Sequence, residues 1–255
     1  MTTFLEAPWV VGTTKPDGLA ALASRPRDAH APDLIEARID LGADLAPDAS
    51  VAQMAERLRI CRELESAGRP VLFTGRLVQD GGRWTDDLGR RHWFEEASRA
   101  VSWLDIEIES PMAQEIVDMG HARGSRVIVS HHDFSGTRSI SELSAIAEKA
   151  RALGADVVKV ATMIKSTDDH ATLIDLVHHH NLPTQPLAIV GMGPWGTALR
   201  SYLPVLGSRL TYGYLDQVSA PGQLHAHELV ARLIQDCPTY AAFRETSRPR
   251  NGRAP

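Results

Sequence analysis

The sequence predicts a single α/β domain folded as a (β/α)8 barrel. Short runs rich in β-branched residues alternate with segments whose apolar residues recur every three or four positions, which is the pattern of strands followed by amphipathic helices. Eight such runs occur, and 255 residues without an internal linker suit one barrel. We expect the barrel to span residues 1–246 and the Arg-, Pro- and Gly-rich residues 247–255 to form a disordered tail.

The expected strands follow one another at the spacing of βαβ units. Their ranges are 9–12, 34–40, 70–76, 103–108, 126–131, 156–161, 187–191 and 210–215. Between them, apolar residues recur at helical spacing, most clearly over 51–64 and 143–153. Gly68, Gly154 and Asn181 stand where the preceding helices should end. Because parallel strands need helical crossovers, this order favours a closed barrel with its chemistry at the carboxyl ends of the strands.

Composition narrows the classes of function. The net charge is −5 with both signs interspersed, so nucleic acid is not an expected partner. No apolar run is long enough to span a bilayer, and the first residues lack a signal-peptide pattern, so we expect a cytoplasmic protein without a membrane partner. Cys61 and Cys237 have no metal-binding spacing, and we expect no metal.

Lys159 is the most informative residue. It lies in the apolar run Val157-Val-Lys-Val-Ala161, in a chain that has only four lysines among its 27 basic residues. Burial of an amine lowers its pKa and leaves more of the free base, which is the nucleophile that attacks carbonyl groups. The alternative is a lysine whose ammonium reaches solvent at a strand end.

Charged residues gather at the predicted strand ends. Glu36, Arg38 and Asp40 alternate with apolar residues, so their side chains should share one face of the strand, either as a catalytic group or as a structural ion-pair ladder. In Ser130-His-His-Asp133 only one of the two adjacent histidines can face the site, where it could move protons or serve a structural role.

Two further segments match ligand-binding patterns, but in each of them other features argue against a bound ligand. Gly191-Met-Gly-Pro-Trp-Gly196 matches a dinucleotide fingerprint, with Asp216 about 20 residues on. The match follows six strands instead of opening the fold, and Pro194 lacks the backbone N–H that a pyrophosphate would use. The residues 178–180 are three consecutive histidines on a helix, and consecutive helical residues cannot face one metal ion.

The small, proline-containing segment 219–223 follows the last expected strand. It could close over the barrel mouth, with hydrogen bonds from Ser219 and Gln223, or be an ordinary connection.

Together these segments resemble the type I 3-dehydroquinate dehydratases, the Schiff-base dehydroquinases of the shikimate pathway. The resemblance is carried, in order, by Glu-Ala-Arg-Ile-Asp at 36–40, Phe-Thr-Gly-Arg at 73–76, Ser-His-His-Asp-Phe at 130–134, Gly-Ala-Asp-Val-Val-Lys-Val-Ala-Thr-Met at 154–163, the segment 192–200 and Ser-Ala-Pro-Gly-Gln at 219–223. It implies a (β/α)8 barrel, a homodimer, 3-dehydroquinate as the small-molecule substrate, and no metal or nucleotide cofactor.

The resemblance also implies roles. Lys159 is similar to the Schiff-base lysine and His132 to the catalytic proton carrier. The residues that resemble substrate-binding groups are Glu36, Arg38 and Arg76 for the hydroxyls, Arg200 for the carboxylate, and Met192, Tyr212, Ser219 and Gln223 for the lining and cover.

The chain departs from the family pattern at Asp80, in the stretch Leu77-Val-Gln79, at Val190 and at Tyr212. Asp80 stands where the family has glutamate as the partner of the catalytic histidine, Val190 where a methionine is common, and Tyr212 where phenylalanine is common. Aspartate is one methylene shorter, so we expect the flexible Gly81-Gly82 pair to let the loop bring Asp80 to His132. The alternative is a long or water-bridged contact that holds His132 more loosely. Two other functions stay open: a Schiff-base aldolase, and a non-catalytic ligand-binding barrel.

Overall fold

Eight parallel strands form the centre of the protein. The computed structural model describes residues 7–42, 51–180 and 186–247. The strands are β1 (Trp9–Thr14), β2 (Leu34–Arg38), β3 (Val71–Thr74), β4 (Trp103–Glu107), β5 (Arg126–Asp133), β6 (Val157–Met163), β7 (Leu187–Met192) and β8 (Leu210–Tyr214). They pair in the order β7-β6-β5-β4-β3-β2-β1-β8, and β7 and β8 meet through the Arg209 N–H to Leu187 carbonyl hydrogen bond (2.8 Å). The predicted (β/α)8 barrel is therefore confirmed.

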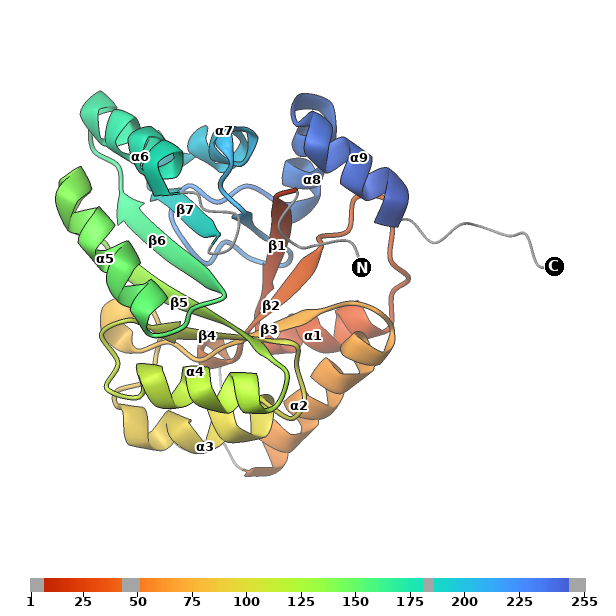
Figure 1. Ribbon diagram of the computed structural model, residues 1–255. Helices are drawn as coiled ribbons and strands as arrows, with labels where there is room; N and C mark the ends of the chain where they lie inside the picture. Colours follow the sequence, from red (N-terminus) through yellow and green to blue (C-terminus); the bar gives the residue numbers. More distant parts are fainter. Residues whose placement is uncertain (1–6, 43–50, 181–185, 248–255) are drawn as a thin grey trace.

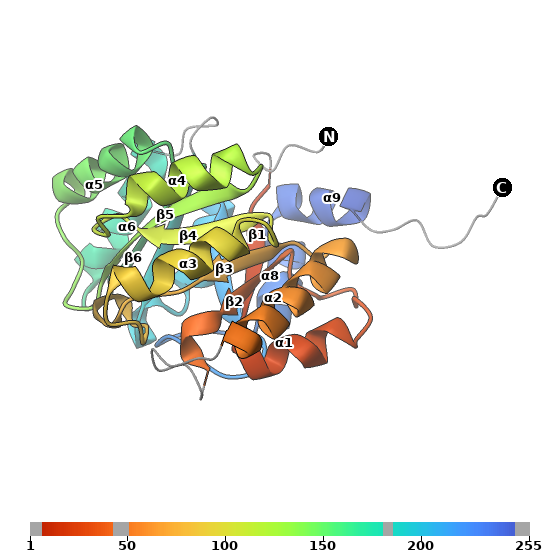
Figure 2. The same cartoon turned by 90° about the horizontal axis from the view of Figure 1, so that it is seen from below.

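Helices surround the strands, as Figure 1 and the view from below in Figure 2 show. They are α1 (Pro16–Ala23), α2 (Val51–Ser66), α3 (Asp87–Ala97), α4 (Ala113–Ala122), α5 (Ile140–Ala152), α6 (Thr167–His180), α7 (Leu199–Leu206), α8 (Ala226–Asp236) and α9 (Pro238–Ser247). Local sequence explains some of the ends: Ser139 and Glu142 form a capping box at the start of α5, and Gly154 after its end has a φ of 90°. Helix α6 ends at His180, and the expected stop at Asn181 falls outside the described residues.

All eight expected strands exist, and most differences are at their ends. One difference concerns the site. Asp40, which we expected on the second strand, lies instead in the 3-10 turn η1 (Ile39–Leu41). The chain leaves strand geometry at Arg38, where ψ is 75°, and the turned Asp40 then accepts hydrogen bonds from Nε (2.9 Å) and Nη2 (2.7 Å) of Arg38. A bidentate ion pair within a turn has replaced the expected strand extension.

The barrel interior is layered. Its lower layer is apolar and includes Leu34, Trp103 and Val157, which pack against one another. Two residues further along the same strands, Glu36, Asp105 and Lys159 point to the same side, because side chains alternate along a strand. A second, larger cluster packs the outer faces of the strands against the helices. The charged residues therefore meet inside the barrel, above an apolar floor.

The amino-terminal end of the barrel is closed by α9. Arg244 donates to Asp33 Oδ1 (2.6 Å) and Tyr240 donates to Asp33 Oδ2 (2.8 Å), while Phe243 stacks on Trp9 with ring centroids 6.0 Å apart. Burial raises the pKa of Asp33 against the opposing charge of Arg244. These contacts hold the last described helix against β1 and leave the opposite end of the barrel for the site. Residues 248–255, most of the expected tail, lie outside the described residues.

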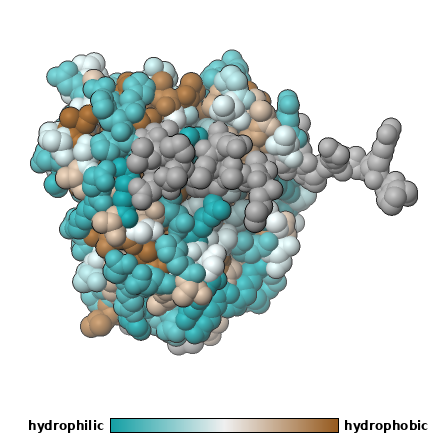
Figure 3. All heavy atoms as spheres, viewed as in Figure 1, coloured by the Kyte–Doolittle hydropathy of each residue, from teal (hydrophilic) through white to brown (hydrophobic). Residues whose placement is uncertain are grey.

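The face of the protein seen in Figure 3 mixes hydrophilic side chains with scattered hydrophobic ones. Within the described ranges, no helix is both long and apolar enough to cross a bilayer.

Candidate active site

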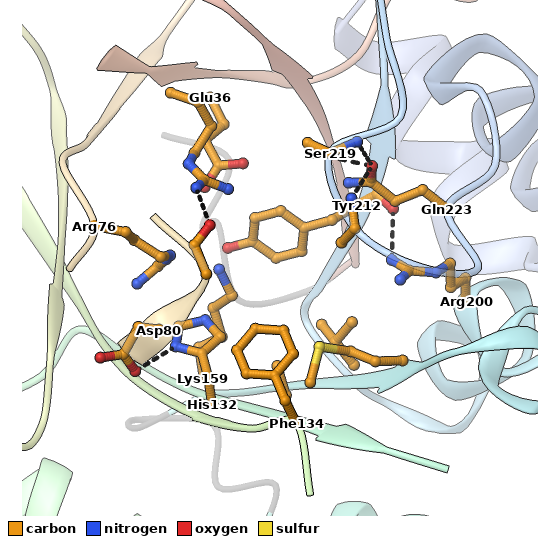
Figure 4. A pocket seen from close by; sticks show the side chains of 16 residues that line it. Glu36, Arg76, Asp80, His132, Phe134, Lys159, Arg200, Tyr212, Ser219 and Gln223 are labelled. Carbon is orange, nitrogen blue, oxygen red and sulfur yellow. Dashed lines mark hydrogen bonds and ion pairs between the residues drawn. The ribbon is translucent and has the colours of Figure 1, made fainter. Parts of the chain in front are cut away.

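A pocket opens at the carboxyl ends of the strands (Figure 4). All eleven residues that the sequence pointed to as site residues line it, and they come from six of the eight strands or the segments that follow them. The pocket is lined by Glu36, Arg38, Arg76, Asp80, His132, Lys159, Met192, Arg200, Tyr212, Ser219 and Gln223, together with Gly81, Phe134, Ala161, Val190 and Ala220. Asp40 is absent from this wall because it is turned back onto Arg38.

Lys159 is buried in the wall of this pocket. Its residue is 6% exposed, which excludes the alternative of a solvent-facing ammonium. Nζ lies 3.2 Å from Oδ2 of Asp105 and 4.1 Å from the ring centroid of Tyr212. Burial lowers the pKa of Lys159, the Asp105 carboxylate opposes this shift, and the nearby Arg76 guanidinium adds to it. A larger fraction of the amine is therefore uncharged near neutral pH than for an exposed lysine.

Asp105 is the residue that the sequence analysis missed. It accepts hydrogen bonds from Arg76 Nη2 (2.5 Å) and Ser130 Oγ (2.6 Å) in addition to its contact with Lys159. Burial by itself would raise the pKa of Asp105, but the charges of Arg76 and Lys159 outweigh it and lower that pKa. Asp105 and Glu107 alternate with apolar residues in Trp103-Leu-Asp-Ile-Glu107, the same signal that singled out Glu36 and Arg38, so the sequence did carry a clue.

Arg76 joins two halves of this network. Its Nη1 donates to Ser130 Oγ (2.9 Å) and lies 3.6 Å from Glu107 Oε1. Glu107 is also bound by Arg90 Nη1 (2.6 Å), a buried residue outside the pocket. Burial opposes the charge of Arg76, but Asp105 and Glu107 raise its pKa overall. Every guanidinium and carboxylate in this chain of contacts has a partner, so the network holds Asp105 in place beside Lys159.

His132 faces the pocket and pairs with Asp80. Its Nδ1 lies 3.2 Å from Oδ1 of Asp80, at the end of the 3-10 turn η2 (Val78–Asp80), while Nε2 is left toward the pocket (Figure 4). Gly81 follows in the left-handed region with φ 79°, and a Cβ on Gly82 would lie 2.1 Å from the Arg76 carbonyl oxygen. Only glycine fits this tight turn, which brings the shorter aspartate to the histidine.

Burial and the surrounding charges determine the protonation states of His132 and Asp80. Burial and the positive charges of Arg76 and Lys159 lower the pKa of His132 well below its usual value. Burial and the Glu107 carboxylate raise the pKa of Asp80 to about 6. At neutral pH we therefore assign a neutral imidazole whose Nδ1–H donates to the Asp80 carboxylate, which leaves Nε2 as the free base. His131 points away, with its Nε2 buried and without a partner among the described residues.

Glu36 and Arg38 are held rigidly on β2. Glu36 accepts hydrogen bonds from Thr13 Oγ1 (2.7 Å) and Thr74 Oγ1 (3.1 Å), one from each neighbouring strand. Arg38 donates to the Gly81 carbonyl (3.1 Å) besides its pair with Asp40, which raises its pKa although burial acts in the opposite direction. Both groups therefore present fixed polar atoms to the pocket.

Arg200, at the start of α7, is a buried cation with no carboxylate partner in the described part of the chain. The residue is 3% exposed, and among the residues that the structure describes its guanidinium donates only to two carbonyl oxygens, those of Tyr212 (3.0 Å) and Pro221 (3.2 Å). Within the described ranges Nε has no hydrogen-bond partner. Burial lowers the pKa of Arg200 to about 10. A buried, unpaired guanidinium in a pocket wall is the arrangement expected for binding an anion.

The segment after β8 covers this side of the pocket. Gln223 Oε1 accepts three hydrogen bonds, from Ser219 N (2.8 Å), Ser219 Oγ (3.0 Å) and Ala220 N (3.1 Å), which closes the turn on itself. The Pro221 carbonyl accepts from Gly193 N (3.2 Å) as well as from Arg200. The loop therefore lies against the end of β7, over the mouth of the barrel.

The glycine-rich segment after β7 serves packing. The N–H of Gly193 is taken by Pro221, and a Cβ on Gly196 would lie 2.4 Å from the carbonyl carbon of Gly191. Asp216 accepts from Lys15 N (3.0 Å) and Thr14 Oγ1 (3.1 Å). These contacts account for the resemblance to a dinucleotide fingerprint without a nucleotide. Among the described residues, no three His, Cys, Asp or Glu side chains come together as a possible metal site, and residues 178–180 are no exception.

Polar groups concentrated at the carboxyl ends of the strands define a (β/α)8-barrel enzyme. A model of the type I 3-dehydroquinase family matches residues 10–235, and the chain belongs to this family. The members of this family are hydro-lyases. A 3-dehydroquinate dehydratase of Klebsiella pneumoniae is 34% identical over 203 residues, covering 75% of this chain and 78% of that protein. One of Methanothrix thermoacetophila is 32% identical over 227 residues, covering 88% and 90%.

Solved structures of this family share the fold. The 3-dehydroquinate dehydratase of Geobacillus kaustophilus superposes with a TM-score of 0.74 at 25% identity, covering 94% of this chain and 93% of that one. The type I enzyme of Clostridium difficile with covalently modified comenic acid superposes with a TM-score of 0.75 at 25% identity, covering 94% of each chain.

Proposed function

We propose that this protein dehydrates 3-dehydroquinate to 3-dehydroshikimate, a step of the shikimate pathway, through a Schiff base on Lys159. The observation that carries the proposal is the buried amine of Lys159 in one pocket with the His132–Asp80 pair and the unpaired cation of Arg200. Family membership supports the reaction, and the pocket supports the assignment of its residues.

The first step joins the substrate to the protein. The lone pair of Lys159 Nζ attacks the ketone carbon, and loss of water leaves an iminium cation. This cation is the electron sink of the reaction, because it acidifies the C–H bonds on the neighbouring carbon. The iminium activates the substrate, a function that a metal ion or a cofactor has in other enzymes. We propose that this enzyme uses neither a metal ion nor a nucleotide cofactor.

The next steps move protons through His132. Nε2 removes a proton from the carbon beside the iminium, which gives an enamine and an imidazolium that the Asp80 carboxylate stabilises. The enamine expels the β-hydroxyl, and His132 returns the proton so that water leaves. Hydrolysis of the new iminium releases the enone and regenerates Lys159. One histidine can serve both steps because Asp80 holds its ring in a single orientation.

Binding is assigned to the rest of the wall. We assign the substrate carboxylate to Arg200, whose charge lacks an anion in the described part of the chain, and the substrate hydroxyls to Glu36, Arg38 and Arg76. Met192 and Tyr212 supply buried surface against the ring, and the loop of Ser219 and Gln223 covers the ligand. Fixed groups of this kind accelerate a reaction mainly by positioning the substrate.

The test is borohydride trapping with 3-dehydroquinate, followed by intact mass and peptide mapping. We expect one ligand-sized mass on the peptide that contains Lys159, and no adduct or turnover in Lys159→Ala. The exposed Lys149 serves as the internal control, because it is ion-paired to Glu109 on the surface. An adduct mapped to Lys149 or Lys165 would refute the assignment. Appearance of enone absorbance separates dehydration from aldol cleavage, and a non-catalytic barrel would give neither product nor adduct.

The resemblance leads us to propose two further properties, a homodimer and a cytoplasmic location. Light scattering on the purified protein gives the oligomeric state, and cell fractionation gives the location. We also propose that residues 1–246 form the catalytic domain. A chain truncated after Thr246 should keep full activity if residues 247–255 are a dispensable tail.

A further inference from the structure

The hydroxyl of Tyr212 is a buried polar group, and nothing in the described part of the protein binds it. Tyr212 lies on β8 and is 4% exposed, and its Oη has no hydrogen-bond partner among the residues that the structure describes. A buried hydroxyl that has lost water without gaining another partner costs free energy, so native proteins rarely keep one without a function. Because Tyr212 lines the pocket, a bound ligand can supply the missing partner.

The position of the ring limits which part of a ligand this is. Nζ of Lys159 lies 4.1 Å from the centroid of the Tyr212 ring. The ligand carbon that bonds to Nζ lies one C–N bond from it, about 1.5 Å, and is therefore also close to the Tyr212 ring. Figure 4 shows the hydroxyl end of the ring pointing into the pocket toward Lys159 and Arg76, away from the loop of Ser219 and Gln223. The hydroxyl therefore faces the reacting end of the ligand and not the carboxylate end at Arg200.

We propose that the Tyr212 hydroxyl is a substrate-binding group. It donates a hydrogen bond to a ligand oxygen attached either to the carbon that bonds to Lys159 or to the neighbouring carbon. This inference rests on the proposed function, since it requires a ligand joined to Lys159. Burial, with the nearby carboxylates of Asp105 and Glu36, raises the pKa of Tyr212 well above its usual value, so the phenol keeps its proton. It acts as a donor, and ketone and hydroxyl oxygens are its matching acceptors.

A purely structural role for Tyr212 makes a different prediction. If the ring serves only as a wall that packs beside Lys159 through its π face, phenylalanine would replace it without loss. The hydroxyl is therefore the atom to test, and Tyr212→Phe removes it while keeping the ring. Tyr214→Phe is the matched control, because Tyr214 ends the same strand, lies outside the pocket lining and packs edge-on against His225.

The experiment compares activity and stability in these two variants. We expect Tyr212→Phe to lower kcat/KM for 3-dehydroquinate by about three- to tenfold, the loss of one hydrogen bond, while its Tm stays equal to or above that of the wild type. The two readouts separate because the hydroxyl has no partner among the described residues of the ligand-free protein, so its removal costs no contact with them. Tyr214→Phe should leave kcat/KM unchanged. Unchanged kcat/KM in Tyr212→Phe, or a fall in Tm that accompanies the loss of activity, would overturn the proposal.

Trapping at subsaturating 3-dehydroquinate separates this inference from the function on which it rests. If the wild type forms an adduct on Lys159 and Tyr212→Phe forms it more slowly, both are supported. Equal rates in the two proteins would overturn the role of the Tyr212 hydroxyl and leave the Schiff base intact. Absence of any adduct in the wild type would refute the proposed function itself.

Discussion

Asp80 Oδ1 lies 3.2 Å from Nδ1 of His132, across 52 positions of sequence. The contact requires a tight turn after β3, in which Gly81 has a positive φ and Gly82 passes against the Arg76 carbonyl. This turn places the side chain of Asp80 within reach of the histidine. Aspartate, although one methylene shorter than glutamate, is thus able to hold the ring of His132 in place.

The first prediction concerns the pH dependence of this pair. The pKa of Asp80 is about 6, so the carboxylate is present above that pH and is neutralised as the pH falls through it. A neutral Asp80 no longer stabilises the imidazolium that forms on His132. We therefore expect kcat/KM to decline on the acidic side with a midpoint near pH 6, as measured by a pH–rate profile.

Substitution of Asp80 tests whether it causes that decline. Asp80→Asn should lower kcat by at least about tenfold and move the acidic limb to lower pH, because the amide cannot titrate or balance the imidazolium charge. Asp80→Glu keeps the charge and is the matched control, for which we expect kcat closer to the wild type. If Asp80→Asn leaves kcat and the acidic limb unaltered, Asp80 is not the functional partner of His132.

Asp105 should be essential for folding stability. Asp105→Asn leaves Arg76 and Lys159 buried without their shared carboxylate, and we expect the free energy of unfolding in urea to fall by about 3–5 kcal/mol. Glu228→Gln removes an exposed ion pair with Arg232 and should cost at most about 1 kcal/mol. A comparable small loss in both variants would show that the buried network contributes little.

Arg200 should govern affinity. Removing the guanidinium in Arg200→Ala leaves the substrate carboxylate without its partner, and we expect binding weaker by about 2–5 kcal/mol, seen as a raised KM. Arg200→Lys should recover only part of the loss, since an ammonium cannot form the forked pair. The exposed Arg232 is the control, and Arg232→Ala should keep the wild-type KM. A wild-type KM in Arg200→Ala would contradict carboxylate binding at this residue.

The loop after β8 should depend on Gln223. Its side-chain oxygen Oε1 accepts three hydrogen bonds from within the loop. Gln223→Ala should therefore raise KM and make residues 219–223 more sensitive to limited proteolysis. Saturating ligand should protect the same residues in the wild type. Gln217→Ala is a matched control on the same connection, because within the described ranges its side chain bonds only Lys15, while its backbone N–H bonds Asp216. Cleavage that is equal with and without ligand would argue against closure of the loop.

Much of this molecule could be read from its sequence. The eight strands were predictable because β-branched runs and helical periodicity are local properties, and most of the pocket was predictable because parallel strands bring their carboxyl ends to one side. The alternation of charged and apolar residues can, however, continue past the point where a strand ends. Asp40 continued the alternation of Glu36 and Arg38, yet it turns off the strand because its carboxylate binds the guanidinium of Arg38.

The sequence alone thus determined the barrel and the residue types that face its mouth, since both follow from patterns along the chain. Only the tertiary structure decided which charges meet. That Lys159 has Asp105 beside it, that Arg200 has no carboxylate among the described residues, and that the Tyr212 hydroxyl lacks a partner depend on contacts between strands far apart in sequence. Pairing and burial together shift the pKa of these groups, and neither is a property of a single segment.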